Sequence, residues 1–394
     1  MSTPDVFFLS GARTAIGDFG GAFKDVAPID LGTHAAKAAI ARSGVEVGEI
    51  GQAVIGHVIH TEPRDMYVSR MVASGAGLPK ETPALTLNRL CGSGLQAIVS
   101  AAQMIKLGDC DLALAGGVES MSRAGYLMPG ARWGQRMGGV NVVDMMVGAL
   151  TDPFGHGHMG VTAENVSQRY GVDRAAQDEA ALESHRRAAA AIADGRFVEQ
   201  IAPYELTTRK GTVMFATDEH VRADVTAADL AKLRPVFKKD GTVTAGNASG
   251  LNDGAAAVVL ASGEAVKARG LSPLGRLVSY GLAGVDPSEM GMGPVPAVKL
   301  ALERAGLTVS DLDVIESNEA FAAQACAVSR VLGFDPAKLN PNGGAIALGH
   351  PVGATGAIIT VKALYELKRI GGRYGLITMC IGGGQGIAMV VERI

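Results

Sequence analysis

The chain repeats part of itself, and this internal repeat limits the folds that it can adopt. The repeat has an offset of 262, because Arg42 aligns with Arg304 (304 − 42). The matching stretches are residues 41–50 with 303–312, residues 92–94 with 354–356, and Leu114 with Leu376. Three matches in register over about 70 residues indicate a duplicated unit rather than chance. We therefore expect two similar halves that pack face to face, with the reactive loops of both at their junction.

Within each half, strand-like segments alternate with helix-like segments. The expected strands are residues 6–9, 53–59, 84–87, 112–115, 255–260, 314–317, 374–379 and 387–392, and the expected helices are residues 30–42, 67–76, 91–107 and 174–195. Such alternation predicts an α/β fold with parallel strand pairing and helices on both faces. A stretch rich in Met, Gly, His and charge interrupts the pattern. We expect an N-terminal half of residues 1–271, with a lid inserted at about 121–249, and a C-terminal half of residues 272–394.

Composition excludes several classes of protein. The 394 residues have a formal net charge of −3 and a pI near 6.3, which gives no electrostatic case for a nucleic-acid partner. The sequence shows neither a secretory signal nor an apolar run of about 18 residues, so we expect no membrane span. The four cysteines form no CxxC pair, and free thiols in a reducing cytoplasm fit best. His156 and His158 resemble a metal-binding pair, but no third ligand is evident, so we expect no metal site.

Four short stretches place reactive side chains among small residues. They are residues 88–97 (NRLCGSGLQA), 318–322 (NEAFA), 343–351 (GGAIALGHP) and 380–386 (CIGGGQG). Small residues let backbone and ligand approach a functional group closely. We expect the four stretches to meet in one cleft and to carry out acyl chemistry through two thiols.

Cys91 is a candidate nucleophile because it begins a predicted helix directly after a predicted strand. A thiol at a helix N-terminus lies near the positive end of the dipole and near free N–H groups, which should lower its pKa. The same N–H groups could stabilise an oxyanion on an acyl group attached to the sulfur. The alternative is a buried structural cysteine, which is a common environment for this residue.

Three further residues could assist a thiol. His350, in a Gly-rich turn before a proline, could act as a base, or it could be a structural loop histidine. Cys380 precedes a Gly-rich turn whose N–H groups could face a thioester carbonyl; a phosphate loop is less favoured, because the spacing is not GxGxxG and a strand follows. Asn318 could hold a water or donate to a carbonyl, or it could cap a helix from Ala320 onward.

With these motifs the sequence resembles the thiolase family over essentially its whole length. It is especially similar to the bacterial biosynthetic thiolases and to broad-range β-ketothiolases among them, which share residues 88–91 (NRLC) and 322–327 (AAQACA). The resemblance implies an α/β thiolase fold, with two duplicated βαβ-type halves packed as αβαβα layers and an inserted lid. It also implies a reversible Claisen condensation of two acyl-CoA molecules. The expected products are acetoacetyl-CoA from two acetyl-CoA, or 3-ketovaleryl-CoA with propionyl-CoA, by a ping-pong route through a Cys91 acyl-enzyme.

The resemblance also assigns expected roles. Cys91 matches the nucleophile, His350 the residue that activates it, and Cys380 the acid/base that moves the α-proton of the second substrate. Asn318, through a water, and His350 match one oxyanion site, and the N–H groups of Cys91 and Gly382 match the other. Positions that contact CoA or the acyl group fall on Leu150, His158, Met159, Arg222, Ala245, Ser249, Ala320 and Phe321. Coenzyme A thioesters are substrates, and no cofactor is implied.

The family resemblance further implies a homotetramer, with residues 123–142 matching the loop that joins two dimers. Alternatives stay open at this point. A degradative 3-ketoacyl-CoA thiolase would use the same motifs. A decarboxylating ketosynthase has a Cys-His-His site, against which Asn318 and Cys380 argue. A nucleotide-binding oxidoreductase would need a GxGxxG after the first strand, and a non-catalytic scaffold would need inert thiols. The stretch 152–157 leaves the acyl-length preference open.

Overall fold

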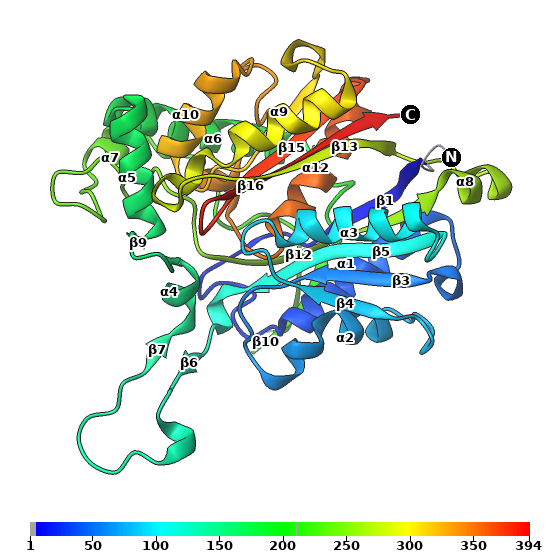
Figure 1. Ribbon diagram of the computed structural model, residues 1–394, viewed down its shortest axis with the longest axis horizontal. Coiled ribbons are helices and arrows are strands. Elements are labelled where there is room, and N and C mark those ends of the chain that lie inside the picture. Colours follow the sequence, from blue (N-terminus) through cyan, green and yellow to red (C-terminus); the bar gives the residue numbers. More distant parts are fainter. Residues whose placement is uncertain (1–4, 210) are drawn as a thin grey trace.

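Two groups of strands enclose a helical layer, and further helices cover their outer faces (Figure 1). The computed structural model describes residues 5–209 and 211–394. The main strands of the N-terminal half are β1 (Val6–Arg13), β2 (Gly17–Asp18), β3 (Gln52–Gly56), β4 (Ala84–Leu87), β5 (Leu112–Ser120) and β12 (Asn252–Ser262). Those of the C-terminal half are β13 (Gly275–Gly284), β14 (Val314–Ser317), β15 (Tyr374–Ile381) and β16 (Gln385–Arg393).

The helices fall into the layers that the family resemblance implies. The middle layer consists of α3 (Ser93–Leu107) and α12 (Thr355–Ile370). The outer layers contain α1 (Pro28–Ser43) and α2 (Val68–Gly75) on the N-terminal half, and α9 (Pro294–Ala305) and α10 (Ala322–Leu332) on the other half. The remaining core helices are α8 (Gly263–Arg269) and α11 (Ala345–Leu348). The αβαβα arrangement is confirmed, because each layer buries an apolar face against its neighbour.

The duplication predicted from the sequence is visible in the strand register. In the N-terminal half Gln52 of β3 pairs in parallel with Ala113 of β5, and in the other half Val314 of β14 pairs in parallel with Gly375 of β15. Both pairs are related by the offset of 262 (314 − 52 and 375 − 113). Hydrogen bonds also join β1 to β13 in an antiparallel pair. This contact, which the sequence did not predict, links both groups into a 10-stranded sheet. Nine of its strands follow the order β14-β15-β16-β13-β1-β12-β5-β3-β4, and β2 pairs with β12 beside this path.

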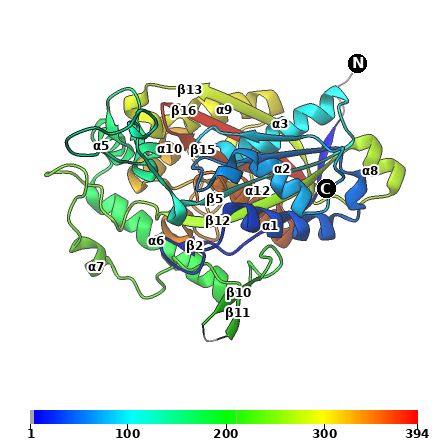
Figure 2. The same cartoon turned by 90° about the horizontal axis from the view of Figure 1, so that it is seen from below.

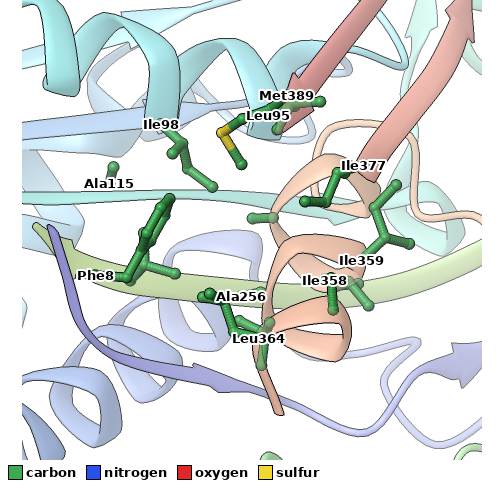
Figure 3. Close-up of a cluster of buried hydrophobic side chains, with 14 of the residues drawn as sticks. Phe8, Leu95, Ile98, Ala115, Ala256, Ile358, Ile359, Leu364, Ile377 and Met389 are labelled. Carbon is green, nitrogen blue, oxygen red and sulfur yellow. The ribbon is translucent and has the colours of Figure 1, made fainter. Parts of the chain in front are cut away.

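The largest apolar core lies in the middle layer, between the two groups of strands. Figure 3 shows Leu95 and Ile98 from α3 gathered with Ile358 and Leu364 from α12, and all four are buried. Phe8 of β1, Ala256 of β12 and Ile377 of β15 belong to the same cluster, so both halves contribute to it. Because burial of such side chains is worth about 1.5–3 kcal/mol each, the two halves stabilise each other.

Several strand boundaries differ from the expected ones; β1, for example, continues to Arg13 rather than ending at residue 9. The strand expected at residues 53–59 ends at Gly56, and the strand expected at residues 112–115 continues to Ser120. The extension has a physical reason: β5 has β3 on one edge and β12 on the other, so its glycines are held in the ladder from both sides. Cys380 likewise lies within β15, rather than after it.

The inserted segment between β5 and β12 carries its own small elements. Three pairs of short antiparallel strands belong to it: β6 (Tyr126–Leu127) with β7 (Val143–Asp144), β8 (Thr151–Asp152) with β9 (Gly157–His158), and β10 (Tyr204–Thr208) with β11 (Gly211–Phe215). Its helices are α4 (Met145–Ala149), α5 (Met159–Tyr170), α6 (Arg174–Ala193) and α7 (Ala227–Ala231). The loop between β6 and β7 extends far from the body in Figure 1, and Figure 2 shows the β10–β11 hairpin projecting beside α6. Of the helices in the described ranges, none is both long and apolar enough to cross a membrane.

Glycines related by the repeat allow α3 and α12 to approach closely at their first turns. A Cβ atom added to Gly356 would lie 2.3 Å from the Leu95 nitrogen. A Cβ atom added to Gly94 would lie 2.8 Å from the Ala357 nitrogen. Gly94 and Gly356 are separated by the same 262 residues (356 − 94), so both halves contribute one small residue to the crossing.

We expect Gly356→Ala to destabilise the protein, because the new methyl group would overlap backbone atoms of α3, which cannot rotate away. Overpacking of this kind costs about 1–3 kcal/mol. Urea unfolding followed by circular dichroism measures the loss. Gly48→Ala is the control, because no atom lies within 4 Å of the added Cβ; its effect should stay within about 0.5 kcal/mol. Equal effects of the two substitutions would contradict the close-crossing interpretation.

Candidate active site

Loops from both halves and from the inserted segment line one cavity, whose empty space, counted together with its open mouth, is about 490 Å³. Its walls are formed by Val58, Leu90, Cys91, Ala149, Leu150, Met159, Ser249, Met290, Ala320, Phe321, His350, Val352 and Gly382. Three of the expected catalytic positions, Cys91, His350 and Gly382, therefore face the same space. Five of the expected substrate positions, Leu150, Met159, Ser249, Ala320 and Phe321, line it as well. A concave, mostly apolar cavity with a few polar groups is typical of a small-molecule site.

Cys91 lies in a tight turn between β4 and α3. Leu90, just before it, has a φ of 44°, a left-handed conformation that is unusual for a residue with a branched side chain. Side chains on both sides stabilise this turn: Asn88 Oδ1 accepts from the Leu90 N–H at 2.8 Å, and Ser93 Oγ accepts from the Arg89 N–H at 2.8 Å. Strained backbone of this type concentrates at functional sites.

The electrostatics of Cys91 differ from the expectation. We expected the helix start to lower the pKa of the thiol, but burial raises its pKa to about 11. The backbone N–H groups of Gly382 and of Cys91 itself act in the opposite direction, because they donate toward the sulfur. Desolvation outweighs these donors, so the resting group is a thiol. Cys91 thus needs a base to become a nucleophile, and two N–H donors are already directed at the place where it reacts.

His350 is oriented by three hydrogen bonds of its turn. Its backbone N–H donates to Asn252 Oδ1 at 2.9 Å, and its Nδ1 lies 2.7 Å from Thr355 Oγ1. The Thr355 hydroxyl donates to the Pro351 carbonyl at 2.9 Å, so its oxygen accepts the Nδ1 proton of the imidazole. Nε2 then carries the lone pair, and it has no partner among the described residues. Burial lowers the pKa of His350 to about 4, so the imidazole is neutral near pH 7 and can accept a proton.

Cys380 lies just behind the cavity wall. It is fully buried and belongs to a cluster that includes Met159, Met290 and Phe321, which line the cavity. Burial raises the pKa of its thiol strongly, and the charge of a Cys91 thiolate raises it further. The two sulfurs are therefore close enough to influence each other, as the sequence predicted for these distant cysteines.

Asn318 is not part of the cavity lining, but it lies two residues before Ala320, which is, and its side chain has two buried hydrogen-bonding groups. Its backbone N–H donates to the Thr378 carbonyl at 3.0 Å at the end of β14. Within the described part of the chain, neither Oδ1 nor Nδ2 of the side chain has a partner. The interpretation of Asn318 as a helix cap is wrong, because α10 begins at Ala322 and follows Phe321 without a side-chain cap. The neighbouring Glu319 turns away and accepts from Ser184 Oγ, Asn340 Nδ2 and the Ile346 N–H.

Three expected substrate positions lie outside the cavity lining. The imidazole of His158 stacks on Phe237 with ring centroids 4.7 Å apart, and its Nδ1 accepts from the Gly160 N–H at 3.1 Å. These contacts fix the His158 imidazole at the start of α5. Arg222 and Ala245 are exposed, and the Arg222 backbone N–H donates to His185 Nδ1.

Sequence reasoning missed several residues of the site. Val58, Leu90, Ala149, Met290 and Val352 line the cavity but carry no reactive group that would single them out. Leu90 and Val352 each lie within two residues of an expected catalytic position, which is the only sequence signal for them. Asn252, which holds the His350 turn, was also missed. It lies at the start of an apolar strand, where a polar residue can indicate a functional or structural role.

The chain matches two family models, thiolase N-terminal domain over residues 6–264 and thiolase C-terminal domain over residues 271–393. Together they span most of the sequence, so the protein belongs to the thiolase family, as the motifs predicted. Beta-ketothiolase BktB of Cupriavidus necator is 66% identical over 393 residues, covering 100% of both chains. An acetyl-CoA acetyltransferase of Rhizobium meliloti is 49% identical, again over 100% of both chains. Human mitochondrial 3-ketoacyl-CoA thiolase superposes with a TM-score of 0.98 at 46% identity, covering 100% of both chains.

The lowered pKa of His350 makes stability depend on pH. Well above pH 6.5 the imidazole is neutral in the folded and in the unfolded protein, so it adds nothing to the pH dependence of the free energy of unfolding. As the pH falls from 6.5 toward about 4, the unfolded chain binds a proton that the folded protein rejects, so stability is lost. We expect His350→Gln to remove up to roughly 3 kcal/mol of this loss. Urea unfolding at several pH values measures the two slopes, and parallel slopes would contradict a buried neutral imidazole.

Proposed function

We propose that this thiolase catalyses the reversible condensation of two acyl-CoA molecules, typically two acetyl-CoA to acetoacetyl-CoA and CoA. The observation that carries the proposal is the shared cavity: one thiol, one neutral imidazole and two N–H donors face it, and a second thiol lies behind its wall. Relatives named beta-ketothiolase and acetyl-CoA acetyltransferase support this substrate class. The proposal includes a second product, 3-ketovaleryl-CoA, from propionyl-CoA and acetyl-CoA.

In the first half-reaction Cys91 takes the acyl group. His350 Nε2 accepts the thiol proton while the sulfur attacks the thioester carbonyl. The oxyanion that forms is stabilised by the N–H groups of Cys91 and Gly382, and one such donor is worth about 3–4 kcal/mol. When the tetrahedral intermediate collapses, the CoA sulfur leaves and takes the proton of Cys380. A covalent acyl-enzyme and a Cys380 thiolate result, while His350 holds one proton.

In the second half-reaction the Cys380 thiolate removes the α-proton of the second acyl-CoA. Its strongly raised pKa suits this step, because a weakly acidic C–H requires a strong base. The enolate oxygen would be met by His350 and, through a water, by the unpaired amide of Asn318. The enolate carbon then attacks the acyl group, and Cys91 leaves as a thiolate that recovers its proton from His350. Each residue returns to its starting protonation state.

Degradation by thiolysis is the same sequence of steps in reverse. The structural similarity to a human 3-ketoacyl-CoA thiolase supports this second candidate direction. Thiolysis rates with acetoacetyl-, 3-ketovaleryl- and 3-ketohexanoyl-CoA would rank the acyl lengths that the enzyme accepts. All four cysteines are free, which supports a reducing compartment such as the cytoplasm.

Substitution of each thiol in turn should affect a different step of the proposed reaction. We expect Cys91→Ser to abolish formation of the acyl-enzyme, because the nucleophile is lost. Cys380→Ser should still acquire the acyl group but lose condensation by at least about 10²-fold, because no base removes the α-proton. Single-turnover labelling with radiolabelled acetyl-CoA, followed by peptide mapping, measures acylation. Loss of acylation in both variants would contradict the assignment.

The loop of residues 123–142 supports a homotetramer built as a dimer of dimers. Trp133 is 85% exposed and Met137 is 91% exposed on a segment that extends away from the body (Figure 1). Large apolar side chains that project together from a surface are typical of an interaction site.

We expect the double substitution Trp133→Glu with Met137→Glu to convert tetramers into dimers, because buried charges would oppose contact between the loops. Light scattering after size exclusion should then give two rather than four times the 40.4 kDa chain mass. Leu107→Glu is the control, since Leu107 is 80% exposed at the far end of α3 and should leave the mass unchanged. A wild-type protein that is already a dimer would overturn the proposal.

A further inference from the structure

A buried carboxylate lies behind the cavity and connects its two halves. Glu119, near the end of β5, is fully buried. Its Oε1 accepts from the Ile59 N–H at 3.1 Å, and its Oε2 accepts from the Val58 N–H at 3.2 Å and from the Gly353 N–H at 2.9 Å. Two donors thus come from the segment after β3, and one comes from the turn that carries His350.

The hydrogen-bond partners of Glu119 favour an ionised carboxylate, whereas its burial opposes one and raises its pKa overall. Each of its hydrogen bonds in the described structure is received from an N–H group. His57 Nδ1 lies 3.5 Å from Oε1 and donates to the Val118 carbonyl at 3.0 Å, and on the far side of that ring Asp65 lies 3.8 Å from Nε2. His60 stacks on His57, with ring centroids 5.3 Å apart. Burial raises the pKa of Glu119, while His57 and the three N–H groups lower it.

The three N–H groups that donate to Glu119 lie in the cavity wall or next to it in the chain. Val58 lines the cavity directly, and Gly353 follows Val352, which lines it from the opposite half. His350 is three residues before Gly353, so the turn between them is fixed by Asn252 at its start and by Glu119 at its end. Glu119 also acts on the nucleophile, since its charge raises the pKa of Cys91.

We propose that Glu119 is a positioning residue for the reaction: it ties the turn of His350 to the segment after β3 and so fixes the imidazole opposite Cys91. This inference rests on the proposed function. Glu119 does not touch the reacting atoms, so its effect is exerted through placement and through its charge. A displacement of about 1 Å in a catalytic group can cost 10²-fold in rate.

Glu119→Gln is the direct test, because it keeps the shape, removes the charge and puts an NH₂ group among N–H donors. We expect kcat for condensation to fall roughly 10- to 100-fold, with KM changed less than about threefold. We also expect the pH midpoint for alkylation of Cys91 by iodoacetamide, followed by mass spectrometry of its peptide, to move to lower pH. Removing a nearby negative charge favours the thiolate.

Glu164→Gln is the matched control. Glu164 is a buried carboxylate on α5 that likewise accepts backbone N–H groups, from Thr242 and Val243, but it has no bond to the His350 turn. The Glu164→Gln substitution should lower the stability of the protein without moving the pH midpoint for alkylation of Cys91. Glu119→Asp separates the effect of charge from the effect of placement. The negative charge is kept, so the pH midpoint for alkylation of Cys91 should not change. The shorter side chain cannot hold the His350 turn in the same place, so kcat should still fall.

The outcomes distinguish this inference from the proposed function. Wild-type kcat and a wild-type alkylation midpoint in Glu119→Gln would overturn the positioning role, as would the same midpoint shift in Glu164→Gln. If Glu119→Gln does not fold, an unchanged kcat in Glu119→Asp overturns it instead. A wild-type protein that neither acylates Cys91 nor condenses acetyl-CoA would instead overturn the proposed function.

Discussion

The close crossing of α3 and α12 at Gly94 and Gly356 is the constraint on which the rest of the structure depends. It brings the first turns of two helices together, and each helix is preceded by a reactive loop. Cys91 lies two residues before α3, and His350 lies five residues before α12 (355 − 350). A larger residue at either glycine would separate these loops as well as the helices. The packing of the core and the geometry of the site therefore share one cause.

Burial determines the chemistry that the site can perform. It raises the pKa of Cys91 to about 11 and lowers that of His350 to about 4, so the resting pair is a thiol and a neutral imidazole. An ion pair is therefore disfavoured at rest. In the proposed mechanism the proton moves only when a substrate accepts the negative charge, and the fixed N–H donors at Cys91 and Gly382 meet that charge. Acylation in this mechanism would need no permanently exposed thiolate.

The sequence predicted the layers, the repeat and the convergence of Cys91, His350 and Gly382, because each depends on a local pattern. Strand and helix periodicity, glycine clusters and an offset that recurs in register can all be read along the chain. The raised pKa of Cys91 could not be read in this way, because it depends on how many atoms surround the sulfur. For the same reason Glu119 and Asn252 were missed. Each looks like an ordinary polar residue in a strand, and only the fold shows which distant N–H groups they accept.

The repeat also explains why two different reactive groups meet. At the offset of 262, Cys91 corresponds to Gly353 (91 + 262), which is three residues after His350. The two halves thus deliver chemically different loops to nearly equivalent places. One loop follows β4, and the other follows the short helix α11, which lies within one residue of the positions equivalent to β4 (84 + 262 = 346). Equivalent positions face each other across a duplicated fold, so the proposed nucleophile on one side and the proposed base on the other line the same cavity without a long connection. Glu119 connects the halves at this same junction, because it lies in the N-terminal half and accepts from the Gly353 N–H in the turn that carries His350.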